Sequence, residues 1–130
     1  MIGYVTLGTN DLEKARAYYD DLLGTLGAKR LMEMDENGFT LYGVDMTQPS
    51  IAITKPDNQK EAFAGNGNMI ALQMQERAEV DAFYNKGIEL GGSDEGGPGV
   101  RGDEGDMAFY AAYFRDPEGN KLCAFRLGPA

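Results

Sequence analysis

The feature that most constrains the fold of this chain is an internal repeat that divides it into two similar halves. Residues 4–28, YVTLGTNDLEKARAYYDDLLGTLGA, align without a gap with residues 69–93, MIALQMQERAEVDAFYNKGIELGGS, at an offset of 65 in a chain of 130 residues. Each copy has the same order of patterns: a short apolar run, an amphipathic helical stripe and a closing glycine. The repeat therefore predicts two modules with the same fold.

Within each half, the patterns predict a β-α-β-β-β order and hence an α+β fold. The first helix is expected to begin with a capping box of Asn10 and Glu13 and to end at Gly27. The second helix carries the same stripe and is expected to end at Gly91 and Gly92. Strands are expected in the apolar runs at 2–8, 29–35, 39–46, 50–54, 68–74, 107–114 and 121–127.

A glycine-rich segment at 91–106 interrupts this pattern in the second half. Residues 97–100 are expected to form only a short strand, and the rest of the segment to be a flexible lid or a solvated loop. The polar segment at about 55–66 is predicted to be a linker. A single domain over 1–130 would then consist of modules at about 1–54 and 67–130.

Composition and charge narrow the function classes. Acidic residues outnumber basic ones by 21 to 12, which gives a formal charge of −9 and disfavours nucleic acid as a partner. No apolar run reaches the roughly 18 residues of a membrane span, and the N-terminus lacks the basic and apolar regions of a secretion signal. One cysteine is compatible with a reducing compartment, so a cytoplasmic location is expected.

The paired modules, together with the stretches GGPGVR at 96–101 and YAAYFRDPEGNKLCAF at 110–125, resemble the vicinal oxygen chelate superfamily. That group includes glyoxalase I, fosfomycin-modifying enzymes, extradiol dioxygenases and bleomycin resistance proteins. The resemblance covers nearly the whole chain and is closest to a small, bacterial-type, glyoxalase-like branch. It implies curved sheets that form a cup around a metal ion, and commonly a homodimer.

The same resemblance implies where metal ligands would stand, namely on the first strand of each module and on the last strand. The matching positions are Tyr4, Met69 and Cys123, where relatives often have His, His and Glu, and the repeat adds Ala52 as the counterpart of Cys123. Hard divalent cations prefer oxygen ligands, whereas Zn, Fe and Ni prefer imidazole and carboxylate. These positions are therefore predicted to be vestigial, with no metal and no other cofactor, although a Cys–Met pair could suit Cu(I).

Strand alternation indicates which further residues share the implied cavity with these positions. The predicted cavity residues are Tyr4, Thr6, Met69, Gln73, Arg101, Phe109, Tyr113, Cys123 and Phe125. Tyr113 stands where fosfomycin-type relatives place a substrate-binding tyrosine; the alternative is an ordinary packed aromatic residue. Arg101 could meet a ligand carboxylate at the rim; the alternative is an ion pair within its own acidic segment. That segment offers Asp103, Glu104 and Asp106.

Three hypotheses for the function follow. The favoured one is metal-independent binding of a small organic molecule, and the acidic charge of the chain favours a cationic ligand. The second is an enzyme, a lyase like glyoxalase I or a transferase, with an unusual metal site or none. The third is a non-catalytic interaction module that has kept the fold. No catalytic residue is assigned, because the chain has no histidine that could serve Cys123 as a base.

Overall fold

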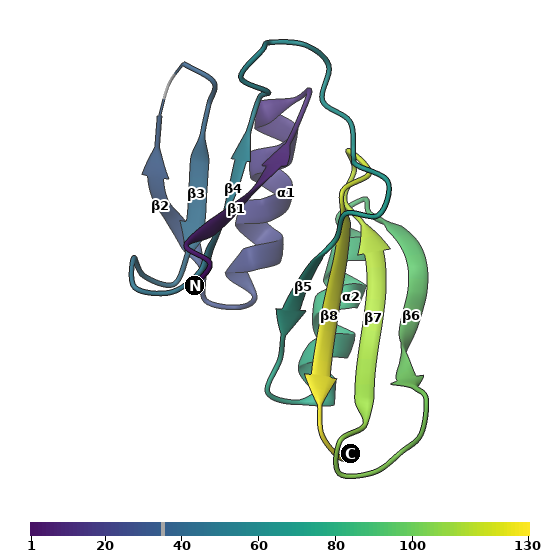
Figure 1. Ribbon diagram of the computed structural model, residues 1–130. Helices are drawn as coiled ribbons and strands as arrows, with labels where there is room; N and C mark the ends of the chain where they lie inside the picture. The colour runs from purple at the N-terminus through teal and green to yellow at the C-terminus, as the bar shows by residue number, and fades with distance from the viewer. Residues whose placement is uncertain (35) are drawn as a thin grey trace. The chain divides into compact units, whose positions relative to one another are not determined.

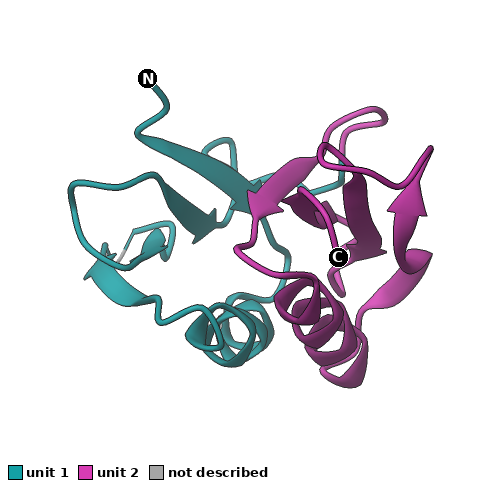
Figure 2. Cartoon of the chain, turned by 90° about the horizontal axis from the view of Figure 1, so that it is seen from below, with its two compact units in different colours: residues 1–64 teal, residues 65–130 magenta. Residues whose placement is uncertain are grey.

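Each half of the chain forms one helix and four strands in the order β-α-β-β-β, as the repeat predicts. The structure is a computed structural model that describes residues 1–34 and 36–130. The described chain divides into two units, Met1–Ala64 and Gly65–Ala130, which Figure 2 colours separately. None of the helices in these ranges is long and apolar enough to cross a membrane.

The first unit places its helix on one side of a mixed sheet (Figure 1). Strand β1 runs parallel to β4, and the remaining neighbours are antiparallel, in the order β1-β4-β3-β2. The elements are β1 (Tyr4–Gly8), α1 (Leu12–Gly24), β2 (Lys29–Glu33), β3 (Thr40–Gly43) and β4 (Ser50–Thr54).

The second unit repeats this topology (Figure 1), and its last three strands are longer than their counterparts in the first unit. Strand β5 runs parallel to β8, and the sheet order is β5-β8-β7-β6. The elements are β5 (Ile70–Gln73), α2 (Arg77–Glu89), β6 (Ser93–Arg101), β7 (Phe109–Arg115) and β8 (Lys121–Leu127). The same β-α-β-β-β order in both units confirms the predicted fold class.

The predicted start of the first helix is wrong by one residue. Asp11, and not Asn10, is the N-cap, and its side chain accepts a hydrogen bond from the backbone N–H of Lys14 at 3.1 Å. Asn10 instead exchanges two hydrogen bonds with the backbone of Ala62, at 2.9 and 2.7 Å. Its side chain is therefore used to hold the segment that follows β4, and not to cap the helix.

Both helices end two or three residues earlier than predicted. Helix α1 ends at Gly24, and Gly27, with a φ of 79°, closes the turn that follows. The predicted end at Gly27 is therefore too late by three residues. Helix α2 ends at Glu89, two residues before the predicted Gly91, which has a φ of 114°, and the N–H of Gly92 donates to the carbonyl of Gly87 at 2.9 Å.

The short strand predicted at 97–100 is confirmed, but it is longer than predicted and takes in part of the loop expected at 91–106. Residues 93–101 form β6, which pairs with β7 and lies at the edge of the sheet. Its pairing shifts register twice, between Asp94 and Gly96 and between Gly96 and Gly99. Glycine permits such bulges, and an edge strand tolerates Pro98 because one row of its backbone groups is unpaired.

Each helix covers one face of its own sheet and leaves the other face for a site. In the first unit, Tyr19 of α1 contacts Tyr42 of β3, with ring centroids 6.4 Å apart. In the second unit, Phe83 of α2 contacts Phe114 of β7, with ring centroids 5.7 Å apart. Neighbouring strand residues point to opposite faces, so Leu41 and Tyr113 lie on the faces that the helices do not cover.

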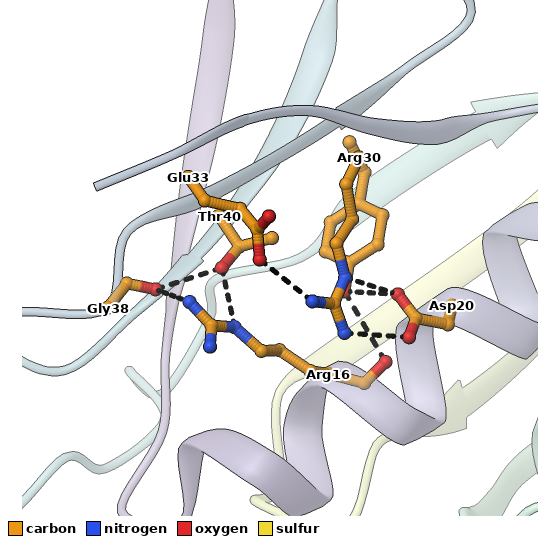
Figure 3. Close-up of polar contacts among 7 residues, drawn as sticks. Arg16, Asp20, Arg30, Glu33, Gly38 and Thr40 are labelled. Atoms are coloured by element: carbon orange, nitrogen blue, oxygen red, sulfur yellow. Dashed lines mark hydrogen bonds and ion pairs between the residues drawn. The ribbon is translucent and has the colours of Figure 1, made fainter. Parts of the chain in front are cut away.

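A polar cluster links α1 to the sheet of the first unit (Figure 3). Arg30 donates two hydrogen bonds to the carboxylate of Asp20, at 2.8 and 2.7 Å, and a third to Glu33 at 2.8 Å. The hydroxyl of Tyr42 also donates to Asp20, at 2.8 Å. The hydrogen bond from Arg30 is the main cause that lowers the pKa of Asp20, and the bond from Tyr42 adds to it against the effect of burial.

This lowered pKa gives a pH prediction. The stabilisation from ionised Asp20 is present above the pKa of an unfolded aspartate, about 3.9. It is lost as the pH falls through the lower pKa of the folded chain. We expect the urea midpoint of unfolding to fall less steeply in Asp20→Asn than in the parent chain as the pH is lowered from neutral to about 3. Asp21→Asn, at an exposed acid of the same helix, is the control, and an equal slope in Asp20→Asn and the parent chain would contradict the prediction.

Candidate functional site

The uncovered sheet face of the first unit carries a pocket of about 700 Å³. Tyr4 and Thr6 of β1, two of the predicted cavity residues, line it. Thr6 and Leu41 flank Ala52 from the two neighbouring strands, and Ala52 is fully buried beneath them. The lining residues are Tyr4, Thr6, Met32, Met34, Glu36, Asn37, Phe39, Leu41, Met46, Thr54, Lys55 and Asp57.

The wall of this pocket is mainly apolar and adaptable. Met32, Met34 and Met46 are 41%, 56% and 64% exposed, so their thioethers face the pocket space and not the core. The rings of Tyr4 and Phe39 meet edge to face, with centroids 5.8 Å apart. Methionine side chains can adjust their shape to a ligand, so the pocket suits the apolar body of a small molecule.

The sequence prediction did not include the methionines or Phe39 as cavity residues. A signal for them is present, because Met32 and Met34 alternate along the strand run at 29–35, and Phe39 and Leu41 alternate along the next one. Applying the same alternation used for β1 to these two runs would have placed Met32, Met34 and Phe39 on the uncovered face, whereas Met46 lies in the turn after β3 and does not follow the alternation.

The second unit gathers the other predicted cavity residues on its own uncovered face. Tyr113 lies opposite Cys123, and Ala111 lies opposite Phe125, across the β7–β8 pair. The rings of Phe109 and Phe125 contact each other with centroids 5.4 Å apart.

Strand β5 borders β8 on the other side of this face. It places Ala71 beside Cys123 and Gln73 beside Phe125, with Met69 immediately before the strand. Gln73 and Met69 are both exposed. All the predicted cavity residues of this unit thus lie on or beside one sheet face, and Tyr4 and Thr6 belong to the face of the first unit.

Arg101 does not form the ion pair within its acidic segment that the sequence left open. Its guanidinium donates to the carbonyls of Gly97 and Gly99, both at 2.8 Å, and lies over the ring of Tyr113 at 5.3 Å from the centroid. Glu104 is held instead by Arg77, at 2.6 and 2.9 Å. Across residues 1–34 and 36–130, no carboxylate is paired with Arg101.

Cys123 is fully buried on β8, with 0% of its surface exposed. Burial raises the pKa of its thiol, and this effect is opposed by a hydrogen bond with Tyr113 and by the charges of Arg101 and Lys121. The thiol is therefore protonated at neutral pH and behaves as a small packed side chain.

The donors at the metal positions do not fit the divalent ion that the resemblance implies. Met69 offers a thioether, Cys123 a buried protonated thiol, Tyr4 a phenol and Ala52 only a methyl group. Divalent metals in such proteins take carboxylate or imidazole ligands. In the part of the chain that the structure describes, no three His, Cys, Asp or Glu side chains are grouped so as to hold a metal ion.

The burial of Cys123 predicts slow thiol chemistry. We expect an aromatic disulfide reagent that releases a coloured thiolate to react with the folded chain at least ~100-fold more slowly than with the urea-unfolded chain. Since the chain has one cysteine, the signal comes from a single site. Fast labelling of the folded chain, at a rate close to that of the unfolded chain, would show that the thiol is accessible.

Comparison with known proteins shows which family the sequence matches. A family model described as the Glyoxalase/Bleomycin resistance protein/Dioxygenase superfamily matches residues 1–124. A search of curated proteins finds no significant match.

Among solved structures, a glyoxalase/bleomycin resistance protein from Albidiferax ferrireducens T118 is 38% identical, with a TM-score of 0.82 over 97% of this chain and 98% of that one. A fosfomycin resistance protein from Listeria monocytogenes is 19% identical, with a TM-score of 0.68 over 97% of this chain and 92% of that one. A lactoylglutathione lyase from Agrobacterium tumefaciens is 18% identical, with a TM-score of 0.63 and the same coverage. The last two comparisons concern the fold alone.

Proposed function

The chain belongs to the glyoxalase/bleomycin resistance protein/dioxygenase superfamily, and on that basis we propose that it binds a small organic molecule without the help of a metal ion. The ligand contacts the face of the first unit's sheet that α1 leaves uncovered. The observation that carries this proposal is the pocket of about 700 Å³ in the first unit, with its wall of methionine and aromatic side chains.

The size and chemistry of this pocket support a ligand and not a packing defect. Ligand pockets typically measure roughly 300–1,000 Å³ and combine an apolar wall with a few polar groups. Here the polar groups are Thr6 and Thr54 on neighbouring strands, with Lys55 and Asp57 immediately after β4. The apolar wall would bury the body of the ligand, and the polar groups would orient it.

Metal independence rests on the donor set described above. Tyr4, Met69 and Cys123 supply no carboxylate and no imidazole, so the ligand would be held by contact and hydrogen bonding alone. We assign no catalytic residue, because the burial of Cys123 raises the pKa of its thiol and thereby disfavours the nucleophilic thiolate. The proposed role is therefore binding, as in sequestration or delivery of the ligand.

The proposal is tested with phenylnaphthylamine, a neutral dye whose fluorescence rises in apolar surroundings. We expect saturable binding of one dye per chain, together with a rise in melting temperature, since the dye binds the folded state. The methyl NMR signals of Met32, Met34 and Met46 should shift, and that of Met107, exposed in the second unit, should not. A thermal-shift screen of organic molecules that yields no hit, with no dye binding, would overturn the proposal.

We also propose that the chain forms a homodimer in the cytoplasm. The support is the family resemblance, which commonly implies paired modules, together with exposed apolar side chains at Ile2, Tyr4 and Phe63. Sedimentation at micromolar concentration should give a mass near two chains. A single-chain mass at that concentration would contradict this part of the proposal and leave ligand binding to be judged by the dye.

A further inference from the structure

Positive charge gathers on the uncovered face of the second unit, against the overall charge of −9. Arg101 and Lys121 both lie over the ring of Tyr113, at 5.3 and 5.4 Å from its centroid. Arg115 is two residues from Tyr113 on β7 and so shares its face; it donates to Glu95 at 2.5 Å. Three cations and one acid leave two positive charges around one aromatic ring.

The bulge in β6 holds the guanidinium of Arg101 in place before any ligand arrives. The carbonyls of Gly97 and Gly99 accept two of its N–H groups, both at 2.8 Å. A Cβ at Gly96 would lie 3.1 Å from Nη2 of Arg101, and a Cβ at Gly99 would lie 3.3 Å from Nη1. Glycine at these two positions therefore leaves room for the guanidinium beside the strand.

Arg101 and Lys121 keep donors that could bind a ligand. A guanidinium carries five N–H groups, and the carbonyls of Gly97 and Gly99 use only two of them. Within residues 1–34 and 36–130, neither Arg101 nor Lys121 forms an ion pair with a carboxylate. Both side chains are only partly exposed, which strengthens a charge–charge contact relative to open water.

We propose that this face is a subsite for the carboxylate group of an aromatic acid, held by Arg101 and Lys121 against Tyr113. The guanidinium fork matches a planar carboxylate, and the paired rings of Phe109 and Phe125 on the same face provide contact area for an aromatic body. The inference goes beyond the proposed function, because this subsite lies in the second unit and the pocket that carries that function lies in the first. It assigns an anionic ligand to this face, in place of the cationic ligand that the net charge of the chain favours.

The test compares benzoate with benzamide, which has nearly the same shape and no charge. NMR titration should show benzoate shifting the signals of Tyr113, Cys123 and Phe125, with an affinity at least ~10-fold higher than that of benzamide. Equal affinity for the two probes, or benzoate shifts that avoid this face, would overturn the inference without any variant.

Variants then test whether Arg101 and Lys121 supply the positive charge that binds benzoate. Arg101→Gln and Lys121→Gln should each lower benzoate affinity roughly tenfold and leave benzamide binding unchanged. Lys86→Gln is the matched control, because it removes the same charge from α2, on the other side of the sheet. Unchanged benzoate binding in both Arg101→Gln and Lys121→Gln, with the backbone NMR spectrum showing a folded chain, would overturn the assignment.

The outcome can be separated from that of the proposed function. Phenylnaphthylamine is read out at Met32, Met34 and Met46 in the first unit, whereas benzoate is read out at Tyr113 in the second. Dye binding without benzoate binding would reject the carboxylate subsite alone. Benzoate binding at Tyr113 without dye binding would support the subsite and reject the pocket of the first unit as the ligand site.

Discussion

Replacing Phe114 with alanine is expected to lower the free energy of unfolding of the second unit by about 3–5 kcal/mol. The ring is fully buried and contacts both Phe83 and Tyr84 of α2, with centroid distances of 5.7 and 6.0 Å. Removing it leaves a cavity between the helix and the sheet whose opposite face carries Tyr113. Urea unfolding followed by circular dichroism measures the loss.

Gly87→Ala provides the complementary half of this experiment. Alanine is favoured over glycine inside a helix by roughly 1 kcal/mol. Here, however, the added Cβ would lie 2.3 Å from Cε2 of Phe114, and overpacking of this kind costs about 1–3 kcal/mol. We therefore expect Gly87→Ala to destabilise the parent chain.

The sign of this effect should reverse when the ring is absent. In the Phe114→Ala background the clash is gone, and Gly87→Ala should stabilise by a few tenths to about 1 kcal/mol. Gly24→Ala in α1 is the control, because nothing lies within 4 Å of its added Cβ. If Gly87→Ala stabilised the parent chain as Gly24→Ala is expected to do, close packing of α2 on Phe114 would be refuted.

The double variant Met34→Gln/Met46→Gln is expected to weaken binding of phenylnaphthylamine by at least ~10-fold. Both methionines line the pocket and are more than half exposed, at 56% and 64%, so glutamine of similar length should leave the fold intact. Each loses apolar contact with the dye, and full burial of a methionine is worth roughly 1.5–3 kcal/mol. Fluorescence titration gives the affinity directly.

Met107→Gln serves as the matched control for this pair. Met107 is 72% exposed and belongs to the second unit, so the same substitution there should leave dye binding unchanged. If the control weakened binding as much as the double variant does, the dye would be binding apolar surface in general. If the double variant bound the dye as tightly as the parent chain, the methionine wall would have no role in binding.

The repeat, the β-α-β-β-β order along the chain and most of the elements could be predicted from the sequence because they follow from local periodicity. Strands β4 and β8 begin and end at the predicted residues. The start of α1 was wrong because Asn10 and Asp11 are both good capping residues, and only the distant bond to Ala62 decides between them. Such a long-range contact leaves no trace in a capping pattern.

Only residues 97–100 of β6 were predicted as a strand, because the stretch SDEGGPGVR has low β-propensity and no alternation. It becomes a strand through pairing with β7, which is a tertiary effect. The same register shifts bring the carbonyls of Gly97 and Gly99 to Arg101. The position of that guanidinium therefore could not be predicted from the sequence either. By contrast, the side of the sheet on which Tyr113 and Cys123 lie follows from alternation alone.

The most direct test of metal-independent binding is a dye titration of protein stripped of metal ions. Phenylnaphthylamine is titrated into protein dialysed against a chelator, and into the same protein supplied with one equivalent of Zn, Ni or Mn. The donor set at Tyr4, Met69 and Cys123 predicts saturable binding with the same affinity in every sample. Binding that appears only after a metal is added, or that strengthens at least ~10-fold with it, would contradict this account.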